Sequence, residues 1–432
     1  MKTSSGSAGI AGGTGEFRTG WPTLAAALAG VATSVSALLI YTLGSFIVPL
    51  EAGLGWSRAD LQLAVSFLAA GGAISVNFAG PLNARHGMRR VTAVSSIALA
   101  AGFLALTQLR GSIGWLYAAY FLLPFAGLGT TPVTWTHAVN LHFVRHRGLA
   151  LSIVLCGTGL TAAVLPPLLS QAMARWSWAA GYALLGALVL MMWLSMAWRL
   201  LPGRDLAAGG RRSNNPAGGP AVNAGLAFAQ VLRSGRFWLC NVSLGLVVSA
   251  IYGMATNIVP MLRSLGLSAA QAGGVFSAFG IALIAGRVVV GLLIDRLWAP
   301  GVAAVALALP AAGCGLLLNA GADASLTMLI LATALCGVGA GAEFDVAAYL
   351  IARYFGLRDY GRTFGLHLSL VTAGSAVAPF GFAALLRDGA GYHAILALCG
   401  GACVAGPALL LLLGRYPTQA TAHLPSGAAT GR

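Results

Sequence analysis

The sequence predicts an all-α membrane protein with twelve transmembrane helices in two pseudo-symmetric six-helix bundles, and three observations carry this prediction. Of its 432 residues, 58% are hydrophobic and only 8% are charged, whereas about 25% of the residues of a soluble domain are charged. Twelve apolar stretches follow one another along the chain, and about 20 apolar residues are enough to cross a hydrocarbon core of about 30 Å. The second half of the chain repeats features of the first.

The apolar stretches define the predicted domains. They cover residues 22–50, 59–82, 91–109, 113–140, 148–170, 178–199, 236–262, 269–293, 301–319, 325–353, 363–386 and 391–414. Residues 201–235 are rich in Gly, Pro, Asn and Arg, which predicts a flexible cytoplasmic linker. We therefore expect one bundle over residues 21–200 and another over 236–414, with a disordered cytoplasmic N-terminus over 1–20 and a cytoplasmic tail over 415–432. Residues 1–20 lack the apolar core of a cleavable signal peptide.

The basic residues predict how the chain is oriented. If both termini and the linker share one side of the membrane, that side holds 19 of the 25 Lys and Arg residues, the other side holds five, and one lies inside a span. Because Lys and Arg accumulate in cytoplasmic loops, both termini are expected to be cytoplasmic. The basic residues are scattered through short loops without an aromatic-rich basic face, so the net charge of +15 does not indicate nucleic-acid binding.

The two halves are related by an internal repeat. A shift of 211 residues aligns Gly80 with Gly291 and Arg85 with Arg296, and a shift of 217 aligns GLALSIVLCG, from residue 148, with GLHLSLVTAG, from residue 365. Two halves in the same orientation are the parallel-repeat plan of major facilitator transporters. The sequence resembles that superfamily, and the resemblance implies a substrate site between the halves near the middle of the membrane.

Two loops resemble the superfamily signature G-x-L-x-D-R-x-G-R-R. They are GPLNARHGMRR over residues 80–90 and GLLIDRLW over residues 291–298, with Ala84 in place of the acid in the first copy. Glycine allows helices to approach closely, and an acid–base pair tethers helix ends. We therefore assign gating and structural roles, rather than substrate contact, to Gly80, Arg85, Arg89, Gly291, Asp295, Arg296 and Arg362.

Three further segments resemble the bacterial monocarboxylate-porter-like and oxalate/formate-antiporter-like branch. They are GWSRADL (55–61), AGRVVVGLLIDR (285–296) and GAEFDVAAYLIARYFGLRDYGRTFG (341–365). The resemblance covers essentially the whole chain. It implies a secondary transporter of a small organic anion in the bacterial inner membrane, working by rocker-type alternating access, without a cofactor and as a monomer. Protons or another ion provide the coupling, and the substrate most in keeping with the branch is a monocarboxylate.

Arg287 is the strongest candidate for substrate contact. It lies inside the apolar span over residues 269–293, where a guanidinium costs at least about 2.5–3.5 kcal/mol. Its planar fork can hold a carboxylate through two parallel hydrogen bonds. In monocarboxylate transporters a helix-8 Arg followed by Gly-Leu engages the substrate, and Arg287 with Gly291-Leu292 fits that position. The helix-1 Lys that is also expected in those carriers is absent from residues 41–43, and the helix-11 Lys that the oxalate/formate antiporter uses is absent from residues 367–372. One embedded cation instead of two favours a monoanion.

Glu343, Asp345 and His367 are the candidates for proton coupling. Two carboxylates inside a span are costly and indicate function. Two positions apart on a helix they point about 200° apart, so we expect one to face the cavity or Arg287 and the other to pair with a helix end. A structural cluster with Arg353, Arg358 or Arg362 explains the acids equally well. His367 could donate to an anion or relay a proton, or bond a neighbouring side chain.

Polar residues within other spans are candidates for lining the substrate cavity. They are Tyr41, His137, Tyr252 and Asn257, and His367 joins them as a substrate-contact candidate. Interhelical hydrogen bonds explain each of these residues equally well.

No motif in the sequence indicates an enzyme. It contains no G-K-[ST] phosphate loop, no HExxH, no G-x-S-x-G and no Cys/His spacing typical of metal ligands, so we expect neither ATP-driven pumping nor a metal. Two alternatives to anion transport stay open. One is a drug or metabolite exporter of the same superfamily, and the other is a membrane ligand sensor that binds without transporting.

Overall fold

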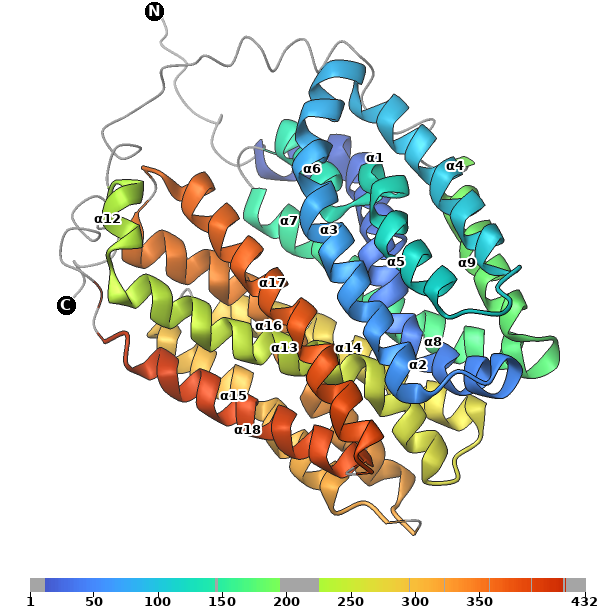
Figure 1. The fold of residues 1–432 in the computed structure, drawn as a ribbon. Helices are drawn as coiled ribbons and strands as arrows, with labels where there is room; N and C mark the ends of the chain where they lie inside the picture. The colour runs from blue at the N-terminus through green and yellow to red at the C-terminus, as the bar shows by residue number, and fades with distance from the viewer. Residues whose placement is uncertain are drawn as a thin grey trace, which may run out of the picture. The chain divides into compact units, whose positions relative to one another are not determined.

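The computed structural model describes residues 12–143, 147–194, 225–294, 296–321, 323–356, 358–389, 391–414 and 416. The described part is helical apart from turns and one isolated bridge between Gly225 and Gly356 (Figure 1). Ten of its helices are long and apolar enough to cross a membrane, judged by length and composition. The fold is therefore that of an all-α, multi-pass membrane protein.

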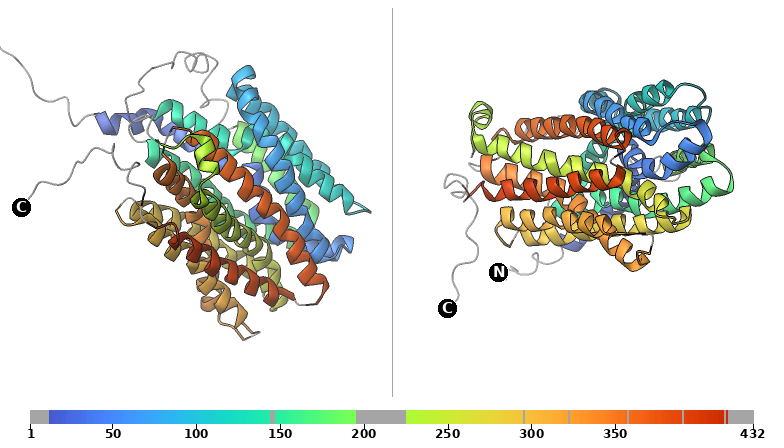
Figure 2. Two further views of the ribbon diagram at one scale, coloured as in Figure 1. Left: turned by 60° about the vertical axis from the view of Figure 1, so that its left-hand side comes forward. Right: turned by 60° about the horizontal axis from the view of Figure 1, so that its bottom comes forward.

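The helices before residue 195 belong to the first predicted half. They are α1 (Gly12–Ala32), α2 (Val35–Leu54), α3 (Arg58–His86), α4 (Met88–Leu106), α5 (Gly114–Ala126), the 3₁₀ turn η1 (Leu128–Thr130), α6 (Pro132–His142), α7 (Arg147–Leu155), α8 (Gly157–Arg175) and α9 (Trp178–Met192). The described helices after residue 224 are α12 (Phe228–Leu232), α13 (Gly235–Ser264), α14 (Ala269–Ile294), α15 (Ala299–Leu318), α16 (Leu326–Phe355), α17 (Tyr360–Arg387) and α18 (Gly391–Leu411) (Figure 2).

Three predicted spans are interrupted, although the sequence predicted each as one helix. The span over 22–50 breaks after Ala32, where the Ser34 side chain accepts a hydrogen bond from the Ala37 amide and starts α2. The span over 113–140 breaks around η1, because Pro132 at the start of α6 cannot donate a helical hydrogen bond. The span over 148–170 is interrupted only at Cys156, whose amide still donates to the Ser152 carbonyl at 3.2 Å. Of the three interruptions, only the one at Ser34 has a side-chain cap. Hydropathy averaged over a span registers none of them.

Two boundaries also differ from the prediction. The N-terminal segment was expected to be disordered to residue 20, but α1 begins at Gly12. The linker was expected to extend to residue 235, but from Gly225 onward the chain is folded, and the Leu226 amide donates to the Phe355 carbonyl at 2.8 Å. The other parts of the predicted terminus and linker, and the tail apart from Tyr416, lie outside the described residues.

The chain forms two compact units. Unit 1 comprises Met1–Arg211 and Ala255–Ile284, and unit 2 comprises Arg212–Met254 and Ala285–Arg432. Residues 255–284, which we had placed in the C-terminal bundle, therefore pack with unit 1. Close glycine contacts explain this: a Cβ on Gly280 would lie 2.1 Å from the Ala163 nitrogen of α8. Only glycine lets α14 approach α8 so closely.

Each unit has its own apolar core. In unit 1 the rings of Phe46 and Tyr182 stack with centroids 4.2 Å apart, and Trp135 is fully buried against α1. In unit 2, α15 packs along both α16 and α18. A Cβ on Gly313 of α15 would lie 2.5 Å from the Ala332 carbonyl of α16. The polar groups described next are set into these cores.

Candidate functional site

Arg287 lies in α14 of unit 2 and is only 4% exposed. It is seven residues before the end of a candidate span, about 10 Å along the helix axis. Its Nε lies 3.2 Å from Asp345 Oδ2 and donates to the Gly341 carbonyl at 3.3 Å. Its Nη1 is buried and has no hydrogen-bond partner. The guanidinium is therefore paired on one edge only.

A glycine beside Arg287 brings α14 and α16 together. A Cβ on Gly286 would lie 2.6 Å from the Val338 carbonyl, so any side chain there would force the two helices apart. On α16, a Cβ on Gly339 would meet Pro310 of α15 at 2.4 Å. The GVGAGA run of α16 is thus packed from two sides, which holds its backbone and Asp345 within reach of Arg287.

The two acids of α16 have different surroundings. The Asp345 side chain is 22% exposed and faces Arg287, whereas Glu343 is 2% exposed and its Oε2 has no hydrogen-bond partner. One acid does face Arg287, as expected from the helical spacing. A helix-end partner for the other was predicted, but among the described residues no salt bridge involves Glu343.

The alternative cluster of the acids with Arg353, Arg358 or Arg362 is not formed among the described ion pairs. Arg353 instead lies with its Cζ 4.8 Å from the Tyr416 ring centroid, and Arg362 lies with its Cζ 4.6 Å from the Phe228 ring centroid. Arg362 therefore contacts α12, the short helix that directly precedes α13. This contact is consistent with the structural role we assigned to it.

His367 is buried in α17 and bonds a neighbouring side chain. Its Nδ1 lies 3.0 Å from Asn241 Oδ1. Because an amide oxygen only accepts, Nδ1 carries the proton and donates. Asn241 in turn donates to the Phe237 carbonyl at 2.8 Å. No described contact joins His367 to Arg287 or to the two acids, so the structure places this histidine in a separate polar pair.

Two other predicted lining residues belong to unit 1. Tyr41 is 8% exposed, and its ring centroid lies 6.1 Å from that of Phe279. Asn257 accepts from Gln62 Nε2 at 2.9 Å and donates to Thr256 Oγ1, whose hydroxyl donates to Gln62 Oε1 at 3.3 Å. These three residues form a closed ring of hydrogen bonds, which satisfies amides that would otherwise be costly to bury.

Two lining candidates remain, Tyr252 and His137. Tyr252 is half-buried in the unit 2 part of α13. His137 lies in α6, and its side chain is outside those described. Of the predicted site residues, the structure thus brings together Arg287, Asp345 and Glu343.

The sequence analysis missed Gln62 and Asn241. Both are amides inside apolar spans and are 1% and 7% exposed. The signal that could have found them is a lone amide within a span, because a buried amide needs a partner on a neighbouring helix.

The gating and structural residues have mixed outcomes. A Cβ on Gly291 would meet no described atom within 4 Å, so no close helix approach is formed there within the described part of unit 2. Arg85 and Arg296 are exposed, and Arg89 is partly buried. The surroundings of Gly80 and the whole of Asp295 are outside the described part of the chain. The tether that the loop motif predicts at Asp295 therefore stays a prediction.

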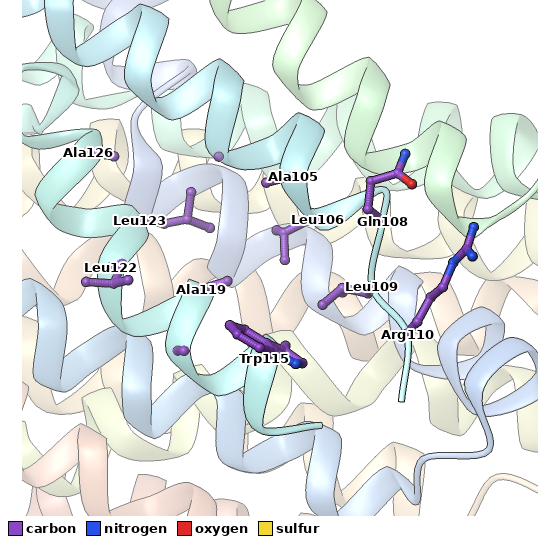
Figure 3. Close-up of a pocket in the computed structure, with 12 residues that line it drawn as sticks. Ala105, Leu106, Gln108, Leu109, Arg110, Trp115, Ala119, Leu122, Leu123 and Ala126 are labelled. Carbon is purple, nitrogen blue, oxygen red and sulfur yellow. The ribbon is translucent and has the colours of Figure 1, made fainter. Parts of the chain in front are cut away.

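A cavity of about 580 Å³ lies away from these residues, between α4 and α5 of unit 1 (Figure 3). Its lining consists of Gly102, Ala105, Leu106, Gln108, Leu109, Arg110, Trp115, Ala118, Ala119, Leu122, Leu123 and Ala126. None of the predicted substrate or coupling residues is among them. The cavity is therefore a feature separate from the buried charge cluster.

Comparisons with known proteins agree with this architecture. The sequence model of the Major Facilitator Superfamily matches residues 29–321 and 255–430. Monocarboxylate transporter 13 of Rattus norvegicus is 27% identical over 82% of this chain and 80% of its own length. The 3-(3-hydroxy-phenyl)propionate transporter of Escherichia coli is 26% identical over 78% of this chain and 80% of its own length.

A solved structure shows the same fold. A mutant of the nucleoside transporter NupG superposes with a TM-score of 0.72 over 91% of this chain and 99% of its own, at 11% identity. The ten long apolar helices, the matched sequence model and this superposition agree, and they show that the chain belongs to the major facilitator superfamily.

Proposed function

We propose that the chain is a secondary transporter that moves a small organic monoanion, a monocarboxylate, together with a proton by rocker-type alternating access. The relatives support this substrate class, because one is named for monocarboxylates and the other for an aryl propionate, which is also a single carboxylate. The basic-residue distribution supports an orientation with both termini cytoplasmic, and the similarity to a transporter of Escherichia coli supports a bacterial inner-membrane location.

The observation that carries the proposal is the half-paired guanidinium of Arg287. Its Nη1 is buried without an acceptor, while its Nε is shared between Asp345 and Gly341. Leaving a buried donor unsatisfied costs about 1–3 kcal/mol. A substrate carboxylate has two oxygens and would satisfy the fork in the bidentate manner that arginine favours.

Protonation of Asp345 would couple anion binding to proton binding. One buried cation cannot neutralise two carboxylates and a substrate anion, and an unpaired buried charge costs several kcal/mol. When a substrate carboxylate binds at the open Nη1 of Arg287, one cation faces the carboxylates of both the substrate and Asp345, which leaves one negative charge uncompensated. Protonation of Asp345 removes that charge, so one anion binds with one proton. Glu343, which has an unpartnered oxygen, is the second candidate for this proton.

Charge neutralisation also supports alternating access. A ligand shifts a conformational equilibrium only through a difference in its affinity for the two states. A site that holds Arg287, the substrate anion and protonated Asp345 has the same net charge as the empty Arg287–Asp345 pair, whereas a site that holds the anion without the proton has one uncompensated negative charge. Closing helices around the anion and the proton together is therefore less costly than closing them around the anion alone. Five residues stay candidates for lining the substrate site: Tyr41, His137, Tyr252, Asn257 and His367.

The test combines ligand binding with transport. A panel of mono- and dicarboxylates is screened for an increase in the Tm of the purified protein and of Arg287→Lys. We expect monocarboxylates to stabilise the wild type and to lose most of that effect in Arg287→Lys, which keeps the charge but not the fork. The stabilising compounds are then tested for counterflow in proteoliposomes. Equal stabilisation of both proteins would exclude Arg287 from the site, and binding without counterflow would indicate a sensor.

A further inference from the structure

The cavity between α4 and α5 has an apolar body and a single charged end. Gly102 and Ala105 of α4 and Ala118 and Ala119 of α5 leave it hollow, and four leucines form its walls. Gln108 and Arg110, in the loop between the helices, lie at one end, and Ala126 lies at the other (Figure 3). At about 580 Å³, its volume falls in the range of about 300–1,000 Å³ found for ligand sites.

The cavity lies where a helix leaves the membrane core. The candidate span of α4 ends at Leu106, so Gln108 and Arg110 follow directly after it. Trp115, at the start of α5, is 69% exposed, and exposed Trp residues are typical of the membrane–water interface. Leu104 and Leu122 are 51% and 59% exposed. Apolar side chains exposed to this degree within a spanning region face hydrocarbon, so the cavity opens towards lipid.

Arg110 gives this groove an unmatched positive charge. No acid is among the lining residues, and no salt bridge in the described part of the chain involves Arg110. Gln108 adds an amide at the same end, donating to Thr107 Oγ1 at 3.3 Å. A cation at the interface above an apolar groove is complementary to a molecule that has an acyl chain below an anionic group.

We propose that this groove binds one anionic phospholipid of the bilayer, with an acyl chain between α4 and α5 and the phosphate on Arg110. The lining explains both parts of the ligand: the small residues make room for the chain, and the lone cation selects the headgroup. The site is independent of Arg287, so its test does not depend on the transport proposal.

The test uses the full-length protein in mild detergent. Native mass spectrometry compares retention of phosphatidylglycerol and phosphatidylcholine with identical acyl chains by the wild type, Arg110→Gln and Arg175→Gln. Arg175 is a matched control, because it is an exposed arginine at the end of α8 next to the exposed Trp176 but lines no part of the cavity. We expect Arg110→Gln to lower phosphatidylglycerol retention by about fivefold and Arg175→Gln to leave it unchanged.

A second measurement locates the lipid. Phosphatidylglycerol carrying a photoreactive diazirine in its acyl chain should label the peptide over residues 102–126, and Ala119→Leu, which fills the groove, should reduce that labelling. Retention that is equal for the two headgroups, or unchanged in Arg110→Gln, would overturn the proposal. Labelling outside residues 102–126, or no labelling, would overturn it as well. Thermal unfolding of each variant shows whether it is folded, and Arg110→Gln changes only an exposed side chain.

Discussion

Two buried polar clusters, one in each unit, are built differently. In unit 1, Gln62, Thr256 and Asn257 are neutral and satisfy one another in a closed ring. In unit 2, Arg287, Asp345 and Glu343 are ionisable, and two of their buried atoms have no partner. A neutral, satisfied ring needs no further ligand, whereas a charged cluster with unfilled positions has bonds available for one. Isolated buried groups without a partner also occur in unit 1, for example Ser66 Oγ and Trp135 Nε1. What distinguishes the unit 2 cluster is that charge and unfilled bonds occur together in one group of neighbouring side chains.

The largest expected effect comes from removing the cation. Arg287→Met should abolish transport and reduce substrate affinity by at least about 100-fold, since breaking a buried charge pair costs about 3–5 kcal/mol. Arg263→Met is the control, because Arg263 Nη1 donates locally, to the Leu267 carbonyl four residues along the chain at 2.9 Å. Counterflow and ligand-induced Tm shifts provide the measurements.

A double variant separates structure from function at the same site. Arg287→Met leaves Asp345 without its partner, so Arg287→Met/Asp345→Asn should regain much of the lost stability but none of the transport. If the double variant transports, Arg287 is a structural residue. Thermal unfolding and counterflow of the same preparations distinguish the two results.

The next effect concerns coupling. In the wild type, uptake should increase as the outside pH falls below the inside pH, with about tenfold accumulation per pH unit for one proton per anion. Asp345→Asn should retain counterflow but lose this pH-driven accumulation, because the residue can no longer release a proton. Glu343→Gln is the matched variant two residues away. Loss of accumulation in Glu343→Gln alone would assign the proton to Glu343 instead.

A smaller effect tests how the charged cluster is held. Gly286→Ala adds a Cβ that would lie 2.6 Å from the Val338 carbonyl, and overpacking typically costs about 1–3 kcal/mol. Gly291→Ala, on the same helix, adds a Cβ in open space and should be neutral or slightly stabilising, because Ala favours a helix over Gly by about 1 kcal/mol. Thermal unfolding compares the pair, and equal Tm values would contradict the packing account.

The smallest effect belongs to the neutral ring of unit 1. Asn257→Leu removes an acceptor of Gln62 and should cost about 0.6 kcal/mol, the average for hydrogen bonds between membrane helices. Gln62→Leu/Asn257→Leu should cost less than the sum of the single changes, since no amide of the pair is left unsatisfied. Loss of substrate-induced stabilisation in these variants would show that the ring contacts cargo after all.

The membrane fold could be predicted from the sequence because it depends on the average hydropathy of each segment. Hydropathy over about 20 residues decides whether a segment enters the bilayer, and each of the ten long apolar helices overlaps a predicted span. Arg287 and the α16 acids could be identified for a related reason, since any charge within such a span is costly enough to stand out.

The partners of these charges could not be predicted, because pairing depends on distances between helices. The sequence left open whether Glu343 or Asp345 faces Arg287, and it missed that Gln62 and Asn241 are the partners of Asn257 and His367. It also placed a close helix contact at Gly291, whereas the contact is at Gly286, five residues earlier. Both glycines look alike in the sequence, and only the neighbouring helix distinguishes them.

The sequence by itself determined that this chain spans a membrane many times, that its two halves repeat, and that one arginine lies at a depth where charge is costly. These properties are sums over local residues and need no knowledge of neighbours. Only the tertiary structure shows that Arg287 Nε pairs with Asp345, whereas Nη1 of the same guanidinium is buried without a hydrogen-bond acceptor. The reason is geometric: hydrogen bonds and ion pairs extend about 3 Å, and only the packing of α14 against α16 brings these groups within that distance.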